Sequence, residues 1–182
     1  MSVCIYYHPE AYSTTGERLM GRNAAGESFL KGYLSYSKQE ESLWIYNNNK
    51  EDVIYFSSLA KRYNRNERII QVSNKRFGRL RDASILYYPG PDIAEQARRR
   101  RFFGDAGWSI CGITHTTASS AATNGIIDLV SAPVREWDGL ICPSTAVKGH
   151  VLNIISAQKE YMRNELGATQ FSLPEIPVIP LG

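Results

Sequence analysis

The sequence predicts an α/β fold, a Rossmann-like three-layer α/β/α sandwich with a mainly parallel sheet of about seven strands. Short apolar runs alternate along the chain with segments whose apolar residues recur at helical spacing. Runs such as 85–88 and 139–142 are apolar without alternation, which is typical of strands that are buried on both faces of a parallel sheet. Because a helix separates each strand from the next, the connections are crossovers and the strands run parallel.

The first strand is expected at 2–8, a β-branched and aromatic run, and a polar loop at 9–20 follows it. The next segment, 21–38, is predicted to be a helix that faces the sheet. Its apolar or small residues, among them Phe29 and Tyr33, recur at helical spacing.

The middle of the chain continues the same alternation. A strand at 42–46 leads to a helix at 50–63, which Asn49 is expected to cap, with acidic residues in its first turn. A strand at 68–72 and a short helix at 75–81 follow.

The rest of the chain contains the longest predicted helix, at 145–166. A strand at 84–88 leads through a tight turn to a helix that Asp92 caps and that ends near Phe103. The remaining elements are strands at 108–115, 137–142 and 176–179 and helices at 120–131 and 145–166.

Composition restricts the class of protein. With 182 residues, 43% of them hydrophobic and 21% charged, the chain fits one domain over 1–182 with a sizeable core. The net charge of +3 is too small to indicate a nucleic-acid partner. Cys4, Cys111 and Cys142 are expected to be buried free thiols of a reducing compartment, and their spacing predicts no metal site. No apolar run spans a membrane and no signal peptide precedes the first strand, so a cytoplasmic protein is expected.

The loop after the first strand carries glycines that could bring backbone N–H groups near an anion. Gly16 to Asn23 has the glycine spacing of a P-loop, but Arg22 and Asn23 replace its Lys and Ser/Thr. No GxGxxG motif follows this strand, which argues against a dinucleotide dehydrogenase. The alternative is that Gly16, Gly21 and Gly26 serve a turn and close helix packing.

Polar residues follow two later strands, where a parallel sheet places its functional groups. His115 and Thr116 end the strand at 108–115, and His115 can donate or accept hydrogen bonds at neutral pH. Ser144 follows Cys142, and its hydroxyl can instead cap the next helix. Because Cys142 ends a buried strand, it is disfavoured as a nucleophile.

The basic run Arg98–Arg101 covers more than one helical turn, so its side chains point in different directions. Such a run usually forms a solvated helix face. Contact with an anionic membrane surface or an acidic partner is the alternative.

Together, the loop 12–26, the strand ends Thr114-His115-Thr116 and Cys142-Pro143-Ser144, and the terminal segment 176–182 resemble the N-terminal domain of a GT-B glycosyltransferase. The likeness is greatest to the retaining family 4. In that family a proline-containing segment leads to a second Rossmann domain, so 173–182 is expected to be the last strand and the start of an interdomain linker. The donor-binding domain would then lie beyond this chain.

The resemblance implies a role for individual residues. His115 would contact the donor sugar near its anomeric centre as the catalytic residue, and Gly16, Gly21 and Arg22 would lie near the donor diphosphate. Candidates for the acceptor side are His8, Glu10, Tyr12, Thr116 and Ser144. No metal and no other cofactor is implied.

The function that the resemblance implies is sugar transfer from a nucleotide-sugar donor to a sugar, lipid-linked or other acceptor, with retained stereochemistry. The chain alone is expected to be inactive, and peripheral contact with the inner face of a membrane is compatible with a lipid-linked acceptor. The alternative is a self-contained Rossmann-like or flavodoxin-like module that binds a nucleotide or a regulator. A hydrolase that uses His115 or His8 as a base is less favoured, because the chain has no GxSxG motif.

Overall fold

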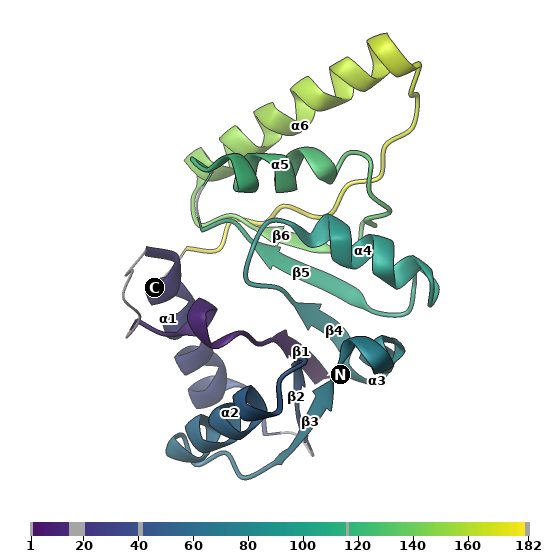
Figure 1. Cartoon of the computed structure of the whole chain (residues 1–182). Coiled ribbons are helices and arrows are strands. Elements are labelled where there is room, and N and C mark those ends of the chain that lie inside the picture. The colour runs from purple at the N-terminus through teal and green to yellow at the C-terminus, as the bar shows by residue number, and fades with distance from the viewer. Residues whose placement is uncertain (1, 15–20, 40–41, 116, 181–182) are drawn as a thin grey trace. The chain divides into compact units, whose positions relative to one another are not determined.

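In a computed structural model of the chain, residues 2–14, 21–39, 42–115 and 117–180 are described, except for the side chain of Arg22. The chain divides into two compact units, unit 1 at 1–89 and unit 2 at 90–181. In both units helices alternate with strands, and the strands that pair within each unit run parallel (Figure 1). The predicted Rossmann-like α/β class is therefore confirmed.

Unit 1 contains a four-stranded parallel sheet in the order β3-β2-β1-β4. Its strands are β1 (Ser2–Tyr6), β2 (Ser42–Tyr46), β3 (Arg68–Val72) and β4 (Ser84–Tyr87). Its helices are the 3-10 helix η1 (Pro9–Tyr12), α1 (Gly21–Tyr36), α2 (Lys50–Arg62), the 3-10 helix η2 (Asn74–Arg79) and α3 (Leu80–Ala83).

Aromatic side chains pack the helices onto the sheet of unit 1. On one face, Tyr87 stacks on Phe29 of α1 with 3.9 Å between ring centroids, and Tyr7 meets Phe56 of α2 edge-on. On the other face, Tyr46 meets Phe77 of η2 edge-on. The core of this unit is therefore rich in aromatic pairs, each of which contributes about 0.5–1.5 kcal/mol beyond the area that it buries.

A buried arginine joins the ends of two helices in unit 1. Arg65, which follows α2, donates hydrogen bonds to the carbonyls of Leu34 and Ser37 at the end of α1. Its charge is balanced by Glu67, with 2.6 Å between the nearest nitrogen and oxygen. A cation at this place also interacts favourably with the negative end of the α1 dipole.

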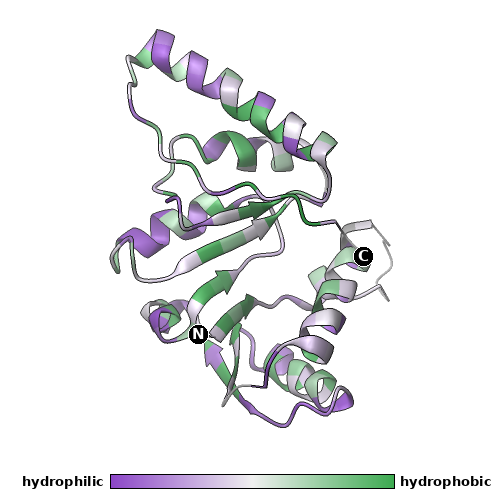
Figure 2. Cartoon of the chain, turned by 180° about the vertical axis from the view of Figure 1, so that it is seen from behind, coloured by the Kyte–Doolittle hydropathy of each residue, from purple (hydrophilic) through white to green (hydrophobic). Residues whose placement is uncertain are grey.

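Unit 2 contains two paired strands, β5 (Ser109–Ile113) and β6 (Gly139–Ile141). Its helices are α4 (Ile93–Arg101), α5 (Ser120–Asp128) and α6 (Thr145–Leu166). Ile110 and Leu140 are fully buried, and the strands are hydrophobic whereas α4 is largely hydrophilic (Figure 2).

The seventh strand expected at 176–179 is not a strand in the structure. The segment runs beside β6 and forms two isolated bridges, Gly139 with Glu175 and Cys142 with Val178. Between them stands Pro177, which accepts a hydrogen bond from the Cys142 N–H at 2.9 Å but has no N–H to return. The missing donor interrupts the hydrogen-bond ladder. The apolar pattern correctly predicts extended chain at 176–179, but the prediction of a continuous strand there is wrong.

The helix expected at 75–81 is divided. Arg76 has φ −130° and ψ 35°, which is outside the helical region, and the segment forms η2 followed by α3. Ser84, with φ +74°, then ends α3 in the left-handed conformation.

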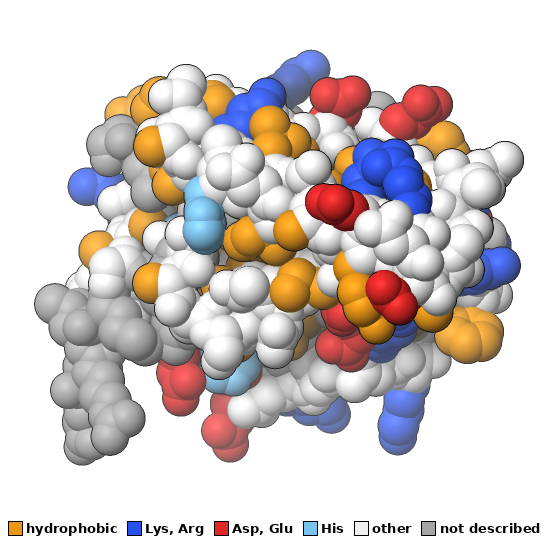
Figure 3. Space-filling model, turned by 90° about the horizontal axis from the view of Figure 1, so that it is seen from above, with side chains coloured by type: hydrophobic (Ala, Val, Ile, Leu, Met, Phe, Trp, Pro, Cys, Tyr) orange, Lys and Arg blue, Asp and Glu red, His pale blue; other side chains and the backbone are white. Residues whose placement is uncertain are grey.

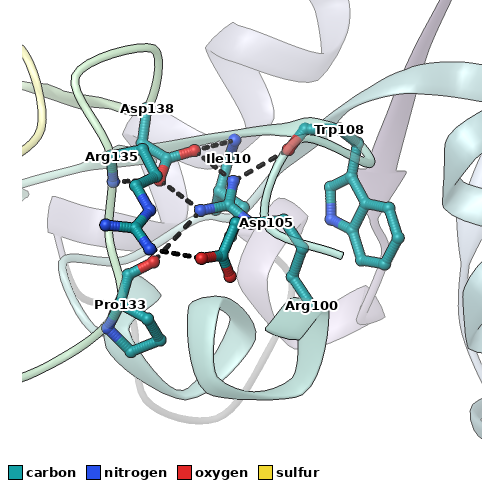
Figure 4. Close-up of polar contacts among 7 residues, drawn as sticks. All are labelled: Arg100, Asp105, Trp108, Ile110, Pro133, Arg135 and Asp138. Atoms are coloured by element: carbon teal, nitrogen blue, oxygen red, sulfur yellow. Dashed lines mark hydrogen bonds and ion pairs between the residues drawn. The ribbon is translucent and has the colours of Figure 1, made fainter. Parts of the chain in front are cut away.

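The sequence predicts that the basic run Arg98–Arg101 of α4 is solvated, but one of its arginines is buried. Arg100 is fully buried and forms a bidentate ion pair with Asp138 (Figure 4). The distances are 2.5 Å from Nη1 to Oδ1 and 2.7 Å from Nη2 to Oδ2. It also donates to the carbonyl of Trp108 at 2.8 Å. Arg98 lies at the surface and pairs with Asp128.

Asp138 organises the chain around this arginine. Its carboxylate also accepts the backbone N–H groups of Ile110 and Arg135, both at 2.8 Å, and its carbonyl accepts the N–H of Glu175. β5 and β6 begin one and two residues later than expected. Arg100 holds the carbonyl of Trp108 just before β5, and the Asp138 carboxylate binds the N–H of Ile110 within that strand.

On the face seen in Figure 3, basic side chains lie among acidic ones. This mixture accords with the net charge of +3. Among the described helices, none has both the length and the apolar character that crossing a bilayer requires.

We expect Arg100→Met to destabilise the protein by about 3–5 kcal/mol, because the variant leaves the Asp138 carboxylate buried without its charged partner. Urea unfolding followed by tryptophan fluorescence measures this change. The matched control is Arg98→Met, which breaks the exposed pair with Asp128 and should cost less than about 1 kcal/mol. Equal losses in the two variants would contradict the assigned role of Arg100.

Candidate functional site

His115 is the second residue after β5, at the carboxyl end of a parallel strand pair. The preceding residue, Thr114, is fully buried and is anchored twice to the Ile141 carbonyl of β6, through its N–H at 2.9 Å and its hydroxyl at 3.1 Å. His115 itself is half-buried, with its Nδ1 atom shielded from solvent. The fold therefore fixes the backbone just before His115, at the end of the strands where α/β proteins bind ligands.

The loop after His115 is fixed at its far end by α5. Ser119 caps this helix by accepting the Ala122 N–H at 3.2 Å, and Thr123 donates its hydroxyl to the Thr117 carbonyl. Thr116, the predicted neighbour of His115, lies outside the described residues.

Ser144 caps α6, as the sequence analysis had allowed. Its hydroxyl oxygen accepts the Val147 N–H at 3.2 Å, and the helix begins at Thr145. The first turn of α6 contains no acidic residue. An acceptor role for Ser144 stays a prediction, and the capping bond is what the structure shows.

The three thiols are free, but their environments disfavour nucleophilic chemistry. Burial raises the pKa of Cys4 and of Cys142, and in Cys142 a hydrogen bond with Thr114 offsets the effect only in part. Cys111 is half-buried rather than buried as expected, and burial still raises its pKa. Because the thiolate is the reactive form, a thiol nucleophile at Cys142 is disfavoured.

The candidates His8, Glu10 and Tyr12 lie together in unit 1, in and just before η1. His8 and Glu10 are exposed. Tyr12 is buried, donates its hydroxyl to the Tyr6 carbonyl at 2.8 Å and stacks on Tyr7. Burial raises the pKa of Tyr12 well above its ordinary value, so its phenol stays protonated at neutral pH.

Among the glycines near α1, the structure assigns close packing to Gly26. A Cβ at this position would lie 1.9 Å from the Ala11 carbonyl oxygen, whereas a Cβ at Gly21 would meet nothing within 4 Å. Asn23 reinforces the same contact by donating to the Glu10 carbonyl at 2.5 Å. The close-packing interpretation of the glycines therefore holds for Gly26.

Of the predicted anion-binding residues, Gly21 and Arg22 stand at the start of α1. This helix begins at Gly21, and its first turn contains no acidic residue. Gly16 lies outside the described residues, as does the side chain of Arg22. Their proximity to a diphosphate stays a prediction.

Asparagines at the end of β2 fasten neighbouring loops. Asn47 donates to the Tyr7 carbonyl and to the Asp52 carboxylate, at 2.7 and 2.9 Å. Asn49 caps α2 as expected, by accepting the Glu51 N–H at 2.9 Å. Asn48 accepts the N–H of Asn74. These side chains are accounted for by the fold.

Sequence reasoning missed three aromatic residues at the carboxyl ends of neighbouring strands, here named the tyrosine row: Tyr46, Tyr6 and Tyr88. Tyr6 of β1 is the register partner of Tyr46 of β2, with 5.1 Å between ring centroids. On its other side Tyr6 meets Tyr88, just after β4, at 4.8 Å. The signal in the sequence is that each tyrosine stands at or next to the end of an apolar run.

Among the described residues, no group of three or more His, Cys, Asp or Glu side chains is arranged to hold a metal ion. Comparison of the chain with models of protein families, with curated proteins and with solved structures finds no match. The functional argument therefore depends on the residues themselves.

We expect Gly26→Ala to destabilise unit 1 by about 1–3 kcal/mol, because the new methyl group must push η1 away from α1. The control is Gly32→Ala in the same helix, where nothing lies within 4 Å of the added carbon. That substitution should stabilise the protein by up to about 1 kcal/mol. Urea titration of both variants checks the sign, and a neutral Gly26→Ala would refute the close contact.

We expect stability to fall above about pH 8.5, where thiols of the unfolded chain ionise while the folded thiols stay protonated. Burial raises the folded pKa of Cys4, so its contribution is complete below the unfolded pKa and is lost as the pH rises toward the folded value. Each such group lowers the unfolding free energy by about 1.4 kcal/mol per pH unit in this range.

The measurement is urea unfolding at pH 7, 8, 8.5 and 9, where most tyrosine side chains are still protonated. The free energy of unfolding of Cys4→Ala should decline less steeply with pH than that of the wild-type chain. This expectation holds whatever stability the variant loses at pH 7. Parallel profiles for the two proteins would show that Cys4 is not protected.

Proposed function

We propose that this chain is the acceptor-binding side of a GT-B glycosyltransferase. The reaction would break the bond between the anomeric carbon and the diphosphate oxygen of a nucleotide-sugar donor. A new bond then joins that carbon to an acceptor hydroxyl, whose proton is lost, and a nucleoside diphosphate departs. The proposed acceptor is a sugar, a lipid-linked compound or another molecule with a free hydroxyl.

The observation that supports this proposal most is the position of His115. It follows a parallel strand, and the doubly bonded Thr114 before it limits its movement. An imidazole at this place can offer a hydrogen bond to a sugar hydroxyl at neutral pH. Its proposed role is to contact the donor sugar near the anomeric carbon.

The start of α1 supports the second part of the proposal. An N-terminus without acidic residues in its first turn favours an anion, since the helix dipole and the unpaired N–H groups attract negative charge. Gly16, Gly21 and Arg22 are the residues that we propose near the donor diphosphate. Stabilisation of the departing diphosphate by such donors requires no metal from this chain.

Two histidines allow a controlled test of this function. In the enzyme encoded by the complete reading frame, His115→Ala should lower kcat for sugar transfer by roughly 100- to 1,000-fold, as for the loss of a group that acts on the developing charge. His150, which is exposed on α6, provides the matched control, and His150→Ala should leave the rate unchanged. Release of nucleoside diphosphate from UDP-glucose or GDP-mannose, with a panel of acceptors, measures both.

Calorimetry on the 182-residue chain tests the competing class. An acceptor-binding side should bind nucleotides, nucleotide sugars and flavins weakly or not at all. Tight binding of one of these compounds, with no sugar transfer by the complete enzyme, would favour a self-contained nucleotide-binding or regulatory module.

A further inference from the structure

The tyrosine row changes from buried to accessible along its length. Tyr46 is only 3% exposed, donates its hydroxyl to the Asn74 side chain and packs edge-on against Phe77, so η2 covers this end. Tyr6 and Tyr88 are half-buried. Part of their surface thus stays accessible at the carboxyl ends of β1 and β4, within unit 1.

This exposure begins abruptly at the ends of the strands. Two positions earlier along the same face of the sheet, Cys4 and Leu86 are fully buried and are register partners. Packing of the sheet against η2 and α3 is therefore complete before Tyr6 and Tyr88 are reached. Burial in the core accounts for Tyr46, whereas Tyr6 and Tyr88 keep part of their surface accessible.

The two accessible rings offer surfaces of different kinds. Their planes meet at 62°, so the edge of one ring approaches the face of the other. A tyrosine combines an apolar ring with a polar hydroxyl, which suits a ligand that has both apolar and hydroxyl-bearing surfaces. Ligand sites in general consist of aromatic surface with a few polar groups.

Several groups that contact the row are neutral, which favours a neutral ligand. Tyr46 contacts Asn74 and Phe77, and the Tyr6 carbonyl accepts the hydroxyl of Tyr12; these three partners bear no charge at neutral pH. Asn47 and Asn48, which follow β2, are also uncharged amides. Such surroundings suit the C–H face of a sugar better than a phosphate.

We propose that Tyr6 and Tyr88 bind a neutral pyranose ring, the C–H face of the sugar lying on the aromatic surface. In the context of the proposed function, on which this part rests, that ring belongs to the acceptor. Tyr6 and Tyr88 then select an acceptor by ring shape, independently of the residues that act on the donor.

Saturation-transfer NMR on the 182-residue chain tests the proposal with methyl β-D-glucopyranoside, whose faces carry axial C–H groups, and with glycerol as an acyclic polyol. The wild-type chain should transfer saturation to the ring protons of the glucoside at millimolar concentration and much less to glycerol. Tyr6→Leu and Tyr88→Leu should each reduce the transfer at least fivefold. Tyr6→Phe, which retains the ring, should keep more than half of it.

Tyr36 provides a matched control, because it is 90% exposed on α1, away from the row in the sequence and the fold. Tyr36→Leu should leave the transfer unchanged. Circular dichroism confirms that each variant is folded, and Tyr88→Leu decides the matter if Tyr6→Leu does not fold. No transfer to the glucoside in the wild-type chain, or equal transfer in Tyr88→Leu and the wild type, would overturn the proposal.

The outcome is separable from that of the proposed function. Tyrosine-dependent sugar binding without sugar transfer by the complete enzyme would support the carbohydrate site and contradict the glycosyltransferase proposal. Sugar transfer whose acceptor KM is the same in Tyr88→Leu and the wild type would support the glycosyltransferase proposal and contradict the tyrosine site.

Discussion

Unit 2 depends on one carboxylate. The two oxygens of Asp138 accept hydrogen bonds from the Arg100 guanidinium and from two backbone N–H groups, so a charge removed from water is fully compensated. Through these bonds α4, the start of β5 and the turn before β6 share a common anchor (Figure 4). A buried ion pair adds little net stability to a protein, but in some systems it makes one conformation unique. Here the geometry favours such a role, because the bonds tie three separate parts of the chain to one side chain.

Local signals predicted most of the fold. The caps Asn49 and Ser144 are short-range patterns, and the helices that follow them begin where the sequence placed them. The burial of Arg100 could not be predicted in this way, since its partner stands 38 residues later and the surrounding run is basic. The interrupted strand at 176–179 was predictable in principle, because Pro177 cannot donate to a ladder. The apolar run outweighed that signal.

In the candidate site, too, local features could be predicted from the sequence and features that depend on distant residues could not. His115 was found from its place at the end of an apolar run, which is a local feature. The tyrosine row needs the register of β1 against β2 and the approach of Tyr88, and neither can be read from one sequence. The sequence does not show that Gly26 is closely packed and Gly21 is not. Only the position of the Ala11 carbonyl in the structure distinguishes the two glycines.

The segment that runs beside β6 has a consequence for biosynthesis. Leu140 and Cys142 donate their N–H groups to this segment, which is separated from them in the chain by the whole of α6. During translation, β6 therefore presents an open edge until the ribosome has synthesised that long helix and the residues after it. At about 5–20 residues per second, this interval lasts on the order of seconds. An unpaired edge is a template for association with other chains, so the nascent protein is most vulnerable to aggregation, and most dependent on chaperones, during this interval.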